Sequence, residues 1–472
     1  MLYSDLRDWI NKVEEFGELR KVEGVDWNLE IGAITEIYAR NEPFPAILFD
    51  KIQGYPAGYR VLVGVHHQSL KKLCLTTHLS LDYDQKEFIA AWKERLHHPR
   101  LIAPRVVDSG PVLENVLEGK DIDLLSLPVP YWHENDGGRY LGTAHVVISR
   151  DIDEGWVNLG CYRVMVHDRD TLALYISPGK HGRIMREKYF DQKRPFPVAI
   201  SFGDDPLLIM AAGNQLPWGS SEYDYAGGIR GEPFEVLTGK HTGLPIPAHS
   251  EITIEGEVWP GEYRREGPYG EWTGYYASGE RSEPVLKVKR MMHRNNPIIT
   301  GAPSSRPPGG SDDGLIRAAF IWDYMEKAGV PDVKGVALYQ GRFLIAVSIR
   351  QRYPGHAKQA GMIASQCHAG AYMGRYVVVV DDDIDVFDIN DVLWALCTRS
   401  DPEKDIDLLR RCWSGPLDPV LPKTANNLNS RAIIDATRPY ERMKEFPVVS
   451  GASRDLKKRV IEKYGRFFRR HE

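Results

Sequence analysis

The chain has 472 residues, of which 42% are hydrophobic and 26% charged, the balance of an ordinary globular protein with room for about two or three domains. Its net charge is only −5 and no long run of one sign appears, which argues against a nucleic-acid surface or a polybasic membrane anchor and leaves small molecules as the expected partners. No apolar stretch is long enough to span a membrane, and the acidic N-terminus lacks the apolar core of a secretion signal, so we expect a cytoplasmic protein.

The first elements predict an N-terminal α/β unit over residues 1–120. Residues 5–17, D-L-R-D-W-I-N-K-V-E-E-F-G, have the apolar spacing of an amphipathic helix that Gly17 closes. Short strands are expected around Ile47 and at residues 61–63. A change of pattern follows at residue 144, where short strands begin to alternate with Gly, Pro and Asp up to about residue 288. We expect a central barrel or sandwich domain over residues 121–304.

The C-terminal part of the chain predicts a second α/β domain over residues 305–450. A stretch rich in Gly and Pro at residues 302–314 marks the boundary, and strands and helices alternate beyond it. Residues 451–472 predict a separate helix with one apolar face, made of Leu456, Val460, Tyr464 and Phe467. That face is expected to pack on protein, within its own subunit or against a partner.

The most informative motif is R-E-G-P-Y-G-E-W-T-G-Y-Y at residues 265–276, which places Glu266 and Glu271 around a stiff Gly-Pro-Tyr-Gly turn. Two carboxylates held in one dry pocket repel each other's charge, which raises one pKa and supplies an acid and a base. The alternative is a surface hairpin with two solvated glutamates, because spacing alone does not reveal burial.

Further ligand chemistry occurs in the same predicted domain. Asn158 and Arg163 stand five residues apart in V-N-L-G-C-Y-R-V. The amide oxygen of Asn158 is suited to a cation, and the guanidinium fork of Arg163 is suited to a carboxylate. His181 follows in a tight loop, and Glu222 starts a run of small residues. Asn, His and Glu together make a mixed oxygen and nitrogen set that suits Mn²⁺ or Mg²⁺ better than zinc. Taken alone, residues of these types are more often structural than ligands.

Seen together, these strings resemble the UbiD family of reversible decarboxylases, which use prenylated flavin mononucleotide (FMN). The resemblance runs along the chain, in N-L-E-I-G-A-I-T, H-E-N-D-G-G-R-Y-L-G-T-A, S-E-Y-D-Y-A-G-G-I-R-G-E-P, E-G-P-Y-G-E, P-G-H-A-K, D-D-D-I-D-V-F-D and W-A-L-C-T-R. It implies an α+β multidomain fold with an N-terminal α/β unit, a central flavin-reductase-like split β-barrel that holds the cofactor, and a C-terminal α/β oligomerisation domain.

The resemblance also assigns roles to residues. The family's Glu-Arg-Glu catalytic network falls on Glu266, Arg163 and Glu271. Substrate is expected to bond covalently to the cofactor, CO₂ then leaves, and Glu271 protonates the carbon. Arg163 and Glu266 are expected to position and tune that acid.

The resemblance also implies which residues contact the cofactor. The divalent ion that bridges the protein to the cofactor phosphate is expected on Asn158, His181 and Glu222. Lys358 matches a lysine that approaches the phosphate, and Arg399 matches an arginine near a K⁺ site built largely from backbone oxygens. Asn214 departs from the apolar residue that some relatives have near that K⁺ site. Lys358 as a solvated lysine and Arg399 as a helix-end ion pair are the plain alternatives.

The expected reaction is the reversible, non-oxidative decarboxylation of an aromatic or heteroaromatic acid, with an α,β-unsaturated or cinnamic-type acid as the alternative. A flavin prenyltransferase is implied as the cofactor supplier, and a homo-oligomer, dimer or hexamer, is expected. Asn429 and Arg431 are candidates to contact a polar ring substituent or to brace their loop. Two other classes stay open: a hydrolase that uses Glu266 and Glu271 as an acid and nucleophile pair, and a flavin-binding module without catalysis.

Overall fold

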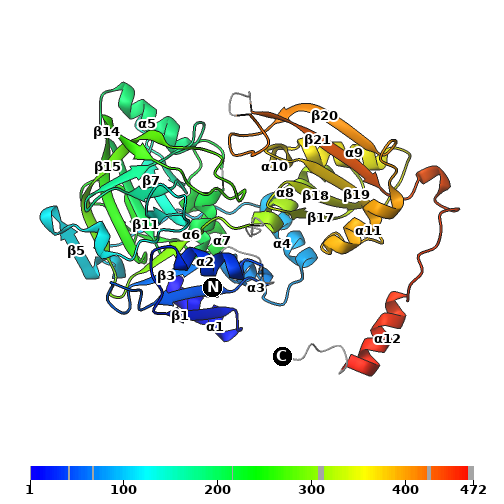
Figure 1. Ribbon diagram of the computed structural model, residues 1–472, viewed down its shortest axis with the longest axis horizontal. Helices are drawn as coiled ribbons and strands as arrows, with labels where there is room; N and C mark the ends of the chain where they lie inside the picture. The colour runs from blue at the N-terminus through cyan, green and yellow to red at the C-terminus, as the bar shows by residue number, and fades with distance from the viewer. Residues whose placement is uncertain are drawn as a thin grey trace.

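The computed structural model describes residues 2–40, 43–65, 69–214, 216–306, 313–422 and 427–465. It is a mixed α/β structure with several sheets: a small N-terminal sheet, a large curled sheet, a short three-stranded sheet and a C-terminal sheet (Figure 1). The C-terminal domain lies beside the curled sheet, and α4 runs between the two. No helix in the described ranges is long and apolar enough to cross a membrane.

The N-terminal helix forms where the apolar spacing predicts it. α1 (Leu6–Glu15) begins at Asp5, whose side chain accepts a hydrogen bond from the Asp8 amide, and Gly17 follows its end with a φ of +81°. One face is buried on the small sheet. The other elements of this unit are β1 (Leu19–Glu23), α2 (Glu30–Tyr38), β2 (Ala46–Asp50), β3 (Arg60–Val63), α3 (Leu70–Thr76) and α4 (Gln85–His97). The late strand β16 (Ile298–Gly301) completes the sheet in the order β1-β2-β3-β16.

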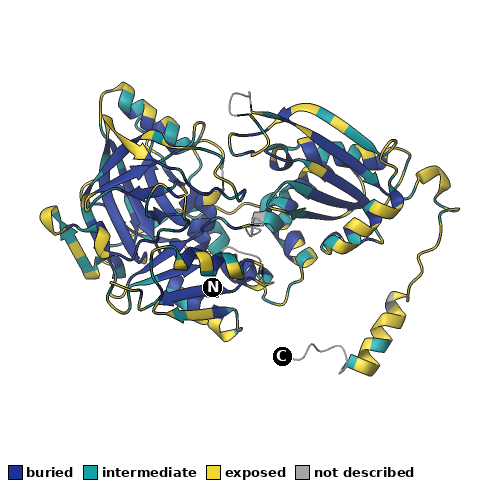
Figure 2. Cartoon of the chain, viewed as in Figure 1, coloured by how far each residue is buried: buried dark blue, intermediate teal, exposed yellow. Residues whose placement is uncertain are grey.

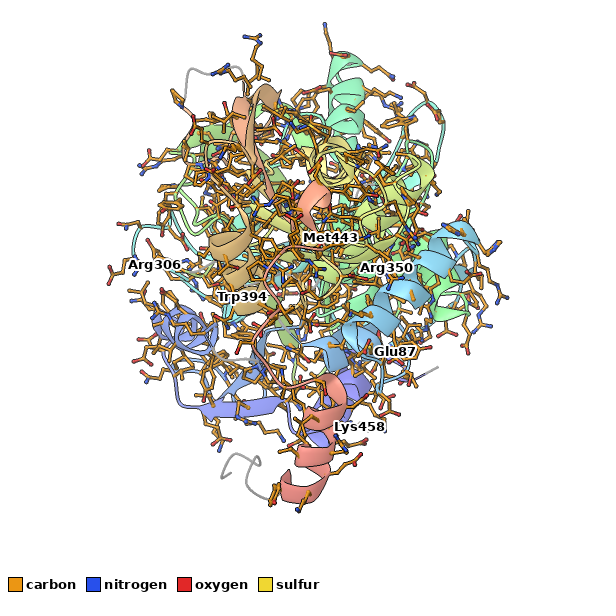
Figure 3. All side chains as sticks on the ribbon, turned by 90° about the vertical axis from the view of Figure 1, so that its right-hand side faces the viewer. Glu87, Arg306, Arg350, Trp394, Met443 and Lys458 are labelled. Carbon is orange, nitrogen blue, oxygen red and sulfur yellow. The ribbon has the colours of Figure 1, made fainter. Side chains whose placement is uncertain are left out.

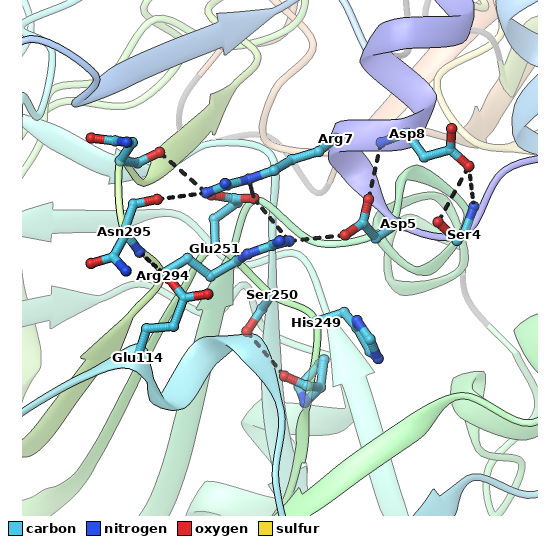
Figure 4. Close-up of polar contacts among 12 residues, drawn as sticks. Ser4, Asp5, Arg7, Asp8, Glu114, His249, Ser250, Glu251, Arg294 and Asn295 are labelled. Carbon is cyan, nitrogen blue, oxygen red and sulfur yellow. Dashed lines mark hydrogen bonds and ion pairs between the residues drawn. The ribbon is translucent and has the colours of Figure 1, made fainter.

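Ion pairs attach this unit to the large sheet (Figure 4). Arg7 on α1 donates to both oxygens of the fully buried Glu251, at 2.7 and 2.8 Å. Arg294 donates to Asp5 at 2.9 Å and lies 3.4 Å from Glu251. Glu251 precedes β14 and Arg294 follows β15, so the helix is fixed to the adjacent ends of two paired strands. Because the shared carboxylate is buried, removal of either arginine would leave it with one cation in place of two and would cost stability.

The large sheet runs β6-β9-β10-β15-β14-β11-β7-β8, with β5 paired to β15. Its hydrophobic residues turn inward, and the burial colours of Figure 2 show a continuous dark interior. Its strands are β5 (Asn115–Glu118), β6 (Tyr140–Gly142), β7 (His145–Arg150), β8 (Val157–Gly160), β9 (Val164–Val166), β10 (Thr171–Leu174), β11 (Phe196–Phe202), β14 (Ile252–Glu266) and β15 (Arg281–His293). Packed beside it are α5 (His181–Asp191), α6 (Pro206–Gly213) and α7 (Glu222–Arg230).

Short elements complete this part of the chain. β4 (Arg105–Val106), β12 (Glu235–Thr238) and β13 (Pro245–Pro247) make the three-stranded sheet, and the single turns are η1 (Pro111–Glu114), η2 (Gly119–Asp121) and η3 (Leu124–Ser126). The long antiparallel pair β14 and β15 sets Glu266 opposite Arg281. This pairing fixes two charged groups, Glu266 and Arg281, at the same end of the sheet.

The C-terminal domain is a three-layer sandwich. Val377 and Val379 of β19 face one layer of helices, while Val378 and Val380 face α11, so every second residue serves a different core. The sheet order is β17-β18-β19-β21-β20. The elements are α8 (Asp313–Lys327), β17 (Val333–Tyr339), β18 (Leu344–Ile349), α9 (His356–Gln366), α10 (His368–Ala371), β19 (Tyr376–Asp381), α11 (Ile389–Arg399), β20 (Ile406–Trp413), β21 (Leu428–Ala436) and η4 (Tyr440–Arg442).

Helices α4 and α8 join the two halves of the chain. Phe88 and Trp92 of α4 belong to the same hydrophobic core as Ile316 of α8. Lys93 adds an ion pair to Glu326 at 2.7 Å and lies 4.6 Å above the Trp322 ring. The C-terminal domain is therefore anchored at one side by apolar packing and a charged rim.

The last helix, α12 (Arg454–Tyr464), stands away from the rest of the chain (Figure 1), and Lys458 marks it in Figure 3. Leu456 and Tyr464 are exposed on it, whereas Val460 is half-buried. Phe467, predicted to share its apolar face, lies outside the described residues.

One buried carboxyl generates a stability prediction. Asp204 is fully buried, accepts from Ser201 at 2.8 Å, and has one oxygen without a partner; burial raises its pKa to about 8. An unfolded aspartate titrates near 3.8, so the folded state carries a penalty that grows as pH rises from about 4 to about 8. Asp204→Asn should therefore raise the unfolding free energy by on the order of 1–3 kcal/mol near pH 8 and by much less near pH 5.

Urea unfolding across this pH range measures the effect. The exposed Asp121→Asn variant removes the same charge without a burial change and serves as control. A gain that stays constant with pH, or one that Asp121→Asn reproduces, contradicts the explanation.

Candidate active site

The predicted Glu-Arg-Glu residues come together at one end of the curled sheet. Glu266 is the last residue of β14, Arg163 directly precedes β9, and Glu271 lies in the loop that follows β14. Gly267 has a φ of +83°, which lets the chain turn sharply after the strand. The loop brings its second carboxylate back over the same guanidinium that contacts the first.

The arginine makes three ion-pair hydrogen bonds. Its Nε and Nη2 donate to the two oxygens of Glu266, each at 2.8 Å, and its Nη1 donates to Glu271 at 2.5 Å. Glu266 is fully buried and Glu271 is 8% exposed. The bidentate pair fixes the plane of the guanidinium, and this plane in turn fixes the position of Glu271. The surface-hairpin alternative is therefore wrong.

The electrostatics separate the two glutamates. Burial raises the pKa of Glu271, and the nearby Arg163 opposes that rise. Burial alone would lower the pKa of Arg163, but its hydrogen bonds to Glu266 raise it above its usual range. Arg163 thus stays charged, while the burial of Glu271 favours its protonated form more than it would in water.

Aromatic and charged neighbours that the sequence did not single out complete this site. Tyr140 donates its hydroxyl to Glu266 at 2.9 Å, and its ring lies 4.5 Å from that of Tyr269. The Tyr175 ring lies 4.5 Å from the Arg163 guanidinium and 4.1 Å from that of Arg281. These rings pack against the charged groups, and the Arg163 side chain is only 8% exposed.

The acidic loop is held by Asp136 and Gly137, in the segment H-E-N-D-G-G. Asp136 accepts from the Gly270 amide at 3.1 Å and from the His133 amide at 3.1 Å. The Gly137 amide donates to the Pro268 carbonyl at 2.7 Å, and a Cβ on Gly137 would come within 1.9 Å of the Gly267 carbonyl oxygen. Sequence reasoning used this segment for the resemblance but gave it no role; its Asp-Gly-Gly turn was the available signal.

Asn158, His181 and Glu222 form a second group on neighbouring elements. The backbone amide of Leu159, next to Asn158, donates to Glu222 at 2.7 Å. The Tyr162 hydroxyl accepts from Asn158 at 3.4 Å and from the amide after His181 at 3.2 Å. Asn158 and Glu222 are buried, and the His181 ring packs edge-on against Trp156 and Trp218. The starts of α5 and α7 thus meet β8 around one polar spot.

The chemistry of this group fits a divalent cation. Burial raises the pKa of Glu222 to about 8, opposed by the Leu159 amide, and no ion pair to Glu222 is present among the described residues. Burial, and then Lys180, lower the pKa of His181, which favours the neutral imidazole that binds metals. In the described ranges no three His, Cys, Asp or Glu side chains are placed to hold a metal ion, so a site here depends on the amide oxygen of Asn158.

Lys180, which sequence reasoning passed over, adds positive charge beside that group. Burial lowers its pKa, and Arg342 and Arg317 of the C-terminal domain lower it further. Cations from both domains therefore approach the same region, which suits a phosphate or carboxylate.

The remaining predicted residues lie elsewhere. Lys358 on α9 pairs with Asp407 at 3.0 Å and is largely exposed. Arg399 at the end of α11 pairs with Asp381 at 3.0 Å and Asp383 at 2.8 Å. Both ion pairs belong to the C-terminal domain, so the structure does not bring these two residues into the groups described above. Asn214 follows the end of α6.

Arg431 and Asn429 brace backbone rather than face open space. The buried Arg431 guanidinium donates to the carbonyls of residues 365, 370, 371 and 413. Asn429 donates to the Gly374 carbonyl at 3.1 Å. The loop-bracing alternative for both residues agrees with these contacts.

Comparison with known proteins identifies the class and then the family. Three family models match: the 3-octaprenyl-4-hydroxybenzoate carboxy-lyase N-terminal domain at residues 10–93, the Rift-related domain at 105–307 and the C-terminal domain at 313–436. A pyrrole-2-carboxylic acid decarboxylase of Pseudomonas aeruginosa is 33% identical over 98% of this chain and 97% of its own length. The chain therefore belongs to the UbiD family of carboxy-lyases.

Solved structures agree with this assignment. The open form of vanillic acid decarboxylase from Sedimentibacter hydroxybenzoicus superposes with a TM-score of 0.86 at 29% identity, covering 100% of both chains. The UbiD-class enzyme HmfF from Pelotomaculum thermopropionicum, in complex with FMN, gives 0.84 at 28% identity over 98% of this chain and 100% of its own. An evolved dimeric form of HmfF with prenylated FMN gives 0.80 at 27% identity, covering 96% and 98%.

The buried network generates a pH-dependent prediction. In Arg163→Gln, Glu266 and Glu271 lose the guanidinium that they share, so the folded state then carries two buried carboxylates without it whenever they are ionised, a cost that protonation at lower pH relieves. The variant should then lose about 3–5 kcal/mol of unfolding free energy at pH 8 and progressively less towards pH 5.

Thermal and urea unfolding at several pH values measure this loss. Arg264→Gln, on the strand β14 that carries Glu266, breaks an exposed pair to Asp168 and is the matched control, with an expected cost of about 0–1 kcal/mol. Equal losses in both variants would contradict the role of the buried network.

Proposed function

We propose that this chain is a prenylated-FMN-dependent decarboxylase that removes CO₂ from an aromatic or heteroaromatic carboxylic acid without oxidation. The observation that carries the proposal is the buried arginine that holds two glutamates, one of which has a raised pKa. The substrates named for relatives, pyrrole-2-carboxylic acid and vanillic acid, support an aromatic or heteroaromatic substrate.

The cofactor is proposed to lie in the curled sheet, used as a flavin-reductase-like split barrel. Prenylated FMN, when bound, supplies the electron sink that accepts the bonding pair as the carboxylate departs. Asn158, His181 and Glu222 would hold Mn²⁺ or Mg²⁺ against its phosphate, with Lys180 adding charge, and K⁺ is the proposed second cation. Lys358 and Arg399 form ion pairs within the C-terminal domain, so in this arrangement of the domains they do not contribute to cofactor binding.

Glu271 is the proposed proton donor. Its carboxyl is buried, which favours the protonated form, and Arg163 stabilises the carboxylate that is left after the proton has moved to the substrate carbon. Glu266 keeps Arg163 in one plane and neutralises it, so that the cation does not suppress protonation of Glu271 completely. Glu271 is thus the acid, Arg163 stabilises the carboxylate that the acid leaves, and Glu266 anchors Arg163.

A hydrolase and a non-catalytic flavin-binding module fit the geometry of the site less well than a decarboxylase. A two-carboxylate hydrolase needs open space between its carboxyl groups for substrate, and here the Arg163 guanidinium contacts both Glu266 and Glu271. A non-catalytic flavin-binding module gives no reason for Glu271 to share the buried Arg163 guanidinium with Glu266. An α,β-unsaturated or cinnamic-type acid stays the second candidate substrate, and high bicarbonate would favour carboxylation.

Assembly and supply complete the proposal. A flavin prenyltransferase supplies the cofactor, and the protein acts in the cytoplasm as a homo-oligomer, dimer or hexamer. The C-terminal domain, with the apolar residues exposed on α12, is the proposed contact between subunits.

Release of CO₂ from a panel of unsaturated and aromatic acids tests the function directly. Protein produced together with a flavin prenyltransferase should absorb visible light and decarboxylate at least one aromatic or heteroaromatic acid. Colourless protein, or coloured protein that releases no CO₂ from any acid, would sink the proposal.

Glu271→Gln tests the acid. Turnover should fall by about 10²–10⁴-fold, because the amide cannot donate the proton, while cofactor absorbance stays unchanged. Glu280→Gln, in an exposed position nine residues later, is the control for charge removal. Near-normal turnover by cofactor-loaded Glu271→Gln would remove Glu271 from this role.

Divalent cation binding is measured by thermal unfolding of the cofactor-free protein. Mn²⁺ at 100 times its dissociation constant should stabilise the folded state by about 2.7 kcal/mol. Glu222→Gln should abolish this gain, whereas the exposed Glu232→Gln, just beyond the same helix, should keep it. The same Mn²⁺ effect in all three proteins would place the ion elsewhere.

A further inference from the structure

The tip of the β17–β18 hairpin reaches from the C-terminal domain to the acidic loop of the central domain. Residues 340–343 form this tip, and Gln340 and Gly341 have φ values of +51° and +73°. Two successive residues in the left-handed region fix the course of a tight hairpin turn. The tip is therefore a defined structure and not a loose end.

Three consecutive tip residues contact one side chain, Trp272. The rings of Phe343 and Trp272 stack with centroids 5.4 Å apart and planes at 24°. The Arg342 guanidinium lies 4.9 Å from the Trp272 ring, and a Cβ on Gly341 would come within 2.6 Å of that ring. Stacked aromatic and cation–π contacts of this kind stabilise an arrangement beyond what burial of the rings alone contributes.

Trp272 directly follows Glu271, so its position is coupled to that of the acid. The Glu271 amide donates to the Tyr275 carbonyl at 3.1 Å, and the Gly274 amide donates to the Glu271 carbonyl at 2.9 Å. Residues 271–275 thus form one small turn, with Trp272 inside it. A displaced tryptophan ring would shift this turn as a unit.

The tip is itself braced within its own domain. The Phe343 carbonyl accepts from the amides of Arg375 and Tyr376, at 3.1 and 2.9 Å, and the Arg375 guanidinium lies 5.5 Å from the Phe343 ring. A rigid support on one side and Asp136 on the other therefore enclose the acidic loop.

We propose that Trp272 and Phe343 are positioning residues, which hold Glu271 against Arg163 and cover it from water as long as the two domains are in contact. This inference rests on the proposed decarboxylase function and deepens it, because it makes the C-terminal domain part of the catalytic arrangement. A misplacement of about 1 Å is enough to cost a proton transfer much of its rate. The charged or titratable groups that face Glu271 are Arg163, Arg281, Glu266 and Tyr269 of the central domain and Tyr372 of the C-terminal domain.

Phe343→Ala and Phe343→Tyr test the role in catalysis. Alanine removes the ring, so kcat should fall about tenfold or more with little change in KM, and the alkaline limb of the kcat profile should move to lower pH because water reaches Glu271 and relieves the burial that raises its pKa. Tyrosine keeps the stack and should behave like the natural protein. Leu408→Ala, exposed on β20 of the same domain, is the control for removal of a large apolar side chain from that domain away from the tip.

Hydrogen exchange of the cofactor-free protein supplies a second readout that needs no substrate. The amides of residues 271 and 274 should exchange about tenfold faster in Phe343→Ala than in the natural protein, in Phe343→Tyr or in Leu408→Ala. Unchanged exchange together with an unmoved pH limb would overturn the proposal. If the natural protein decarboxylates no acid, the exchange result alone decides whether the hairpin holds the loop, so the two failures are distinguishable.

Discussion

The bidentate ion pair between Arg163 and Glu266 is the constraint on which the site depends. Two parallel hydrogen bonds of 2.8 Å fix the guanidinium in one plane, and only its third nitrogen is left for Glu271. Because Glu266 ends a long strand that pairs with β15, the sheet fixes the position of this carboxylate and, through it, the orientation of the arginine. The flexible part of the site is then limited to the short loop that carries the acid, and that loop is clamped from both sides.

A second buried carboxylate that contacts two arginines lies at the other end of β14. Glu251 just before the strand joins Arg7 and Arg294, as Glu266 at its end joins Arg163 and lies 3.8 Å from Arg281. One strand thus has a buried glutamate beside each end, one structural and one in the candidate site. Buried charges of this kind add little net stability, but they penalise every arrangement in which a partner is displaced, so they define a single geometry.

Much of the fold and the centre of the site could be predicted from the sequence. The amphipathic helix that begins the chain, the short strands of the central domain and the alternation of strands and helices in the C-terminal domain follow from periodicity, because each element buries one face. The Glu-Arg-Glu network followed from a rigid turn and a resemblance in motif order.

Contacts between distant segments could not be predicted. Nothing in the composition of H-E-N-D-G-G says that Asp136 accepts from Gly270, and nothing in the 340–343 turn points to Trp272. Local pattern determines which face of an element is buried, whereas the partner of that face is set by how whole domains pack. The ion pairs of Arg399 show the same limit, since an arginine near an acidic strand end fits a binding site and an internal salt bridge equally well in sequence.

The close approach at Gly137 constrains how this scaffold can be altered. A single methyl group there would collide with the carbonyl of Gly267. Efforts to widen the range of accepted acids by randomising the acidic loop would therefore fail wherever the library also varies position 137, since every non-glycine residue displaces the backbone that the newly chosen side chains must rely on.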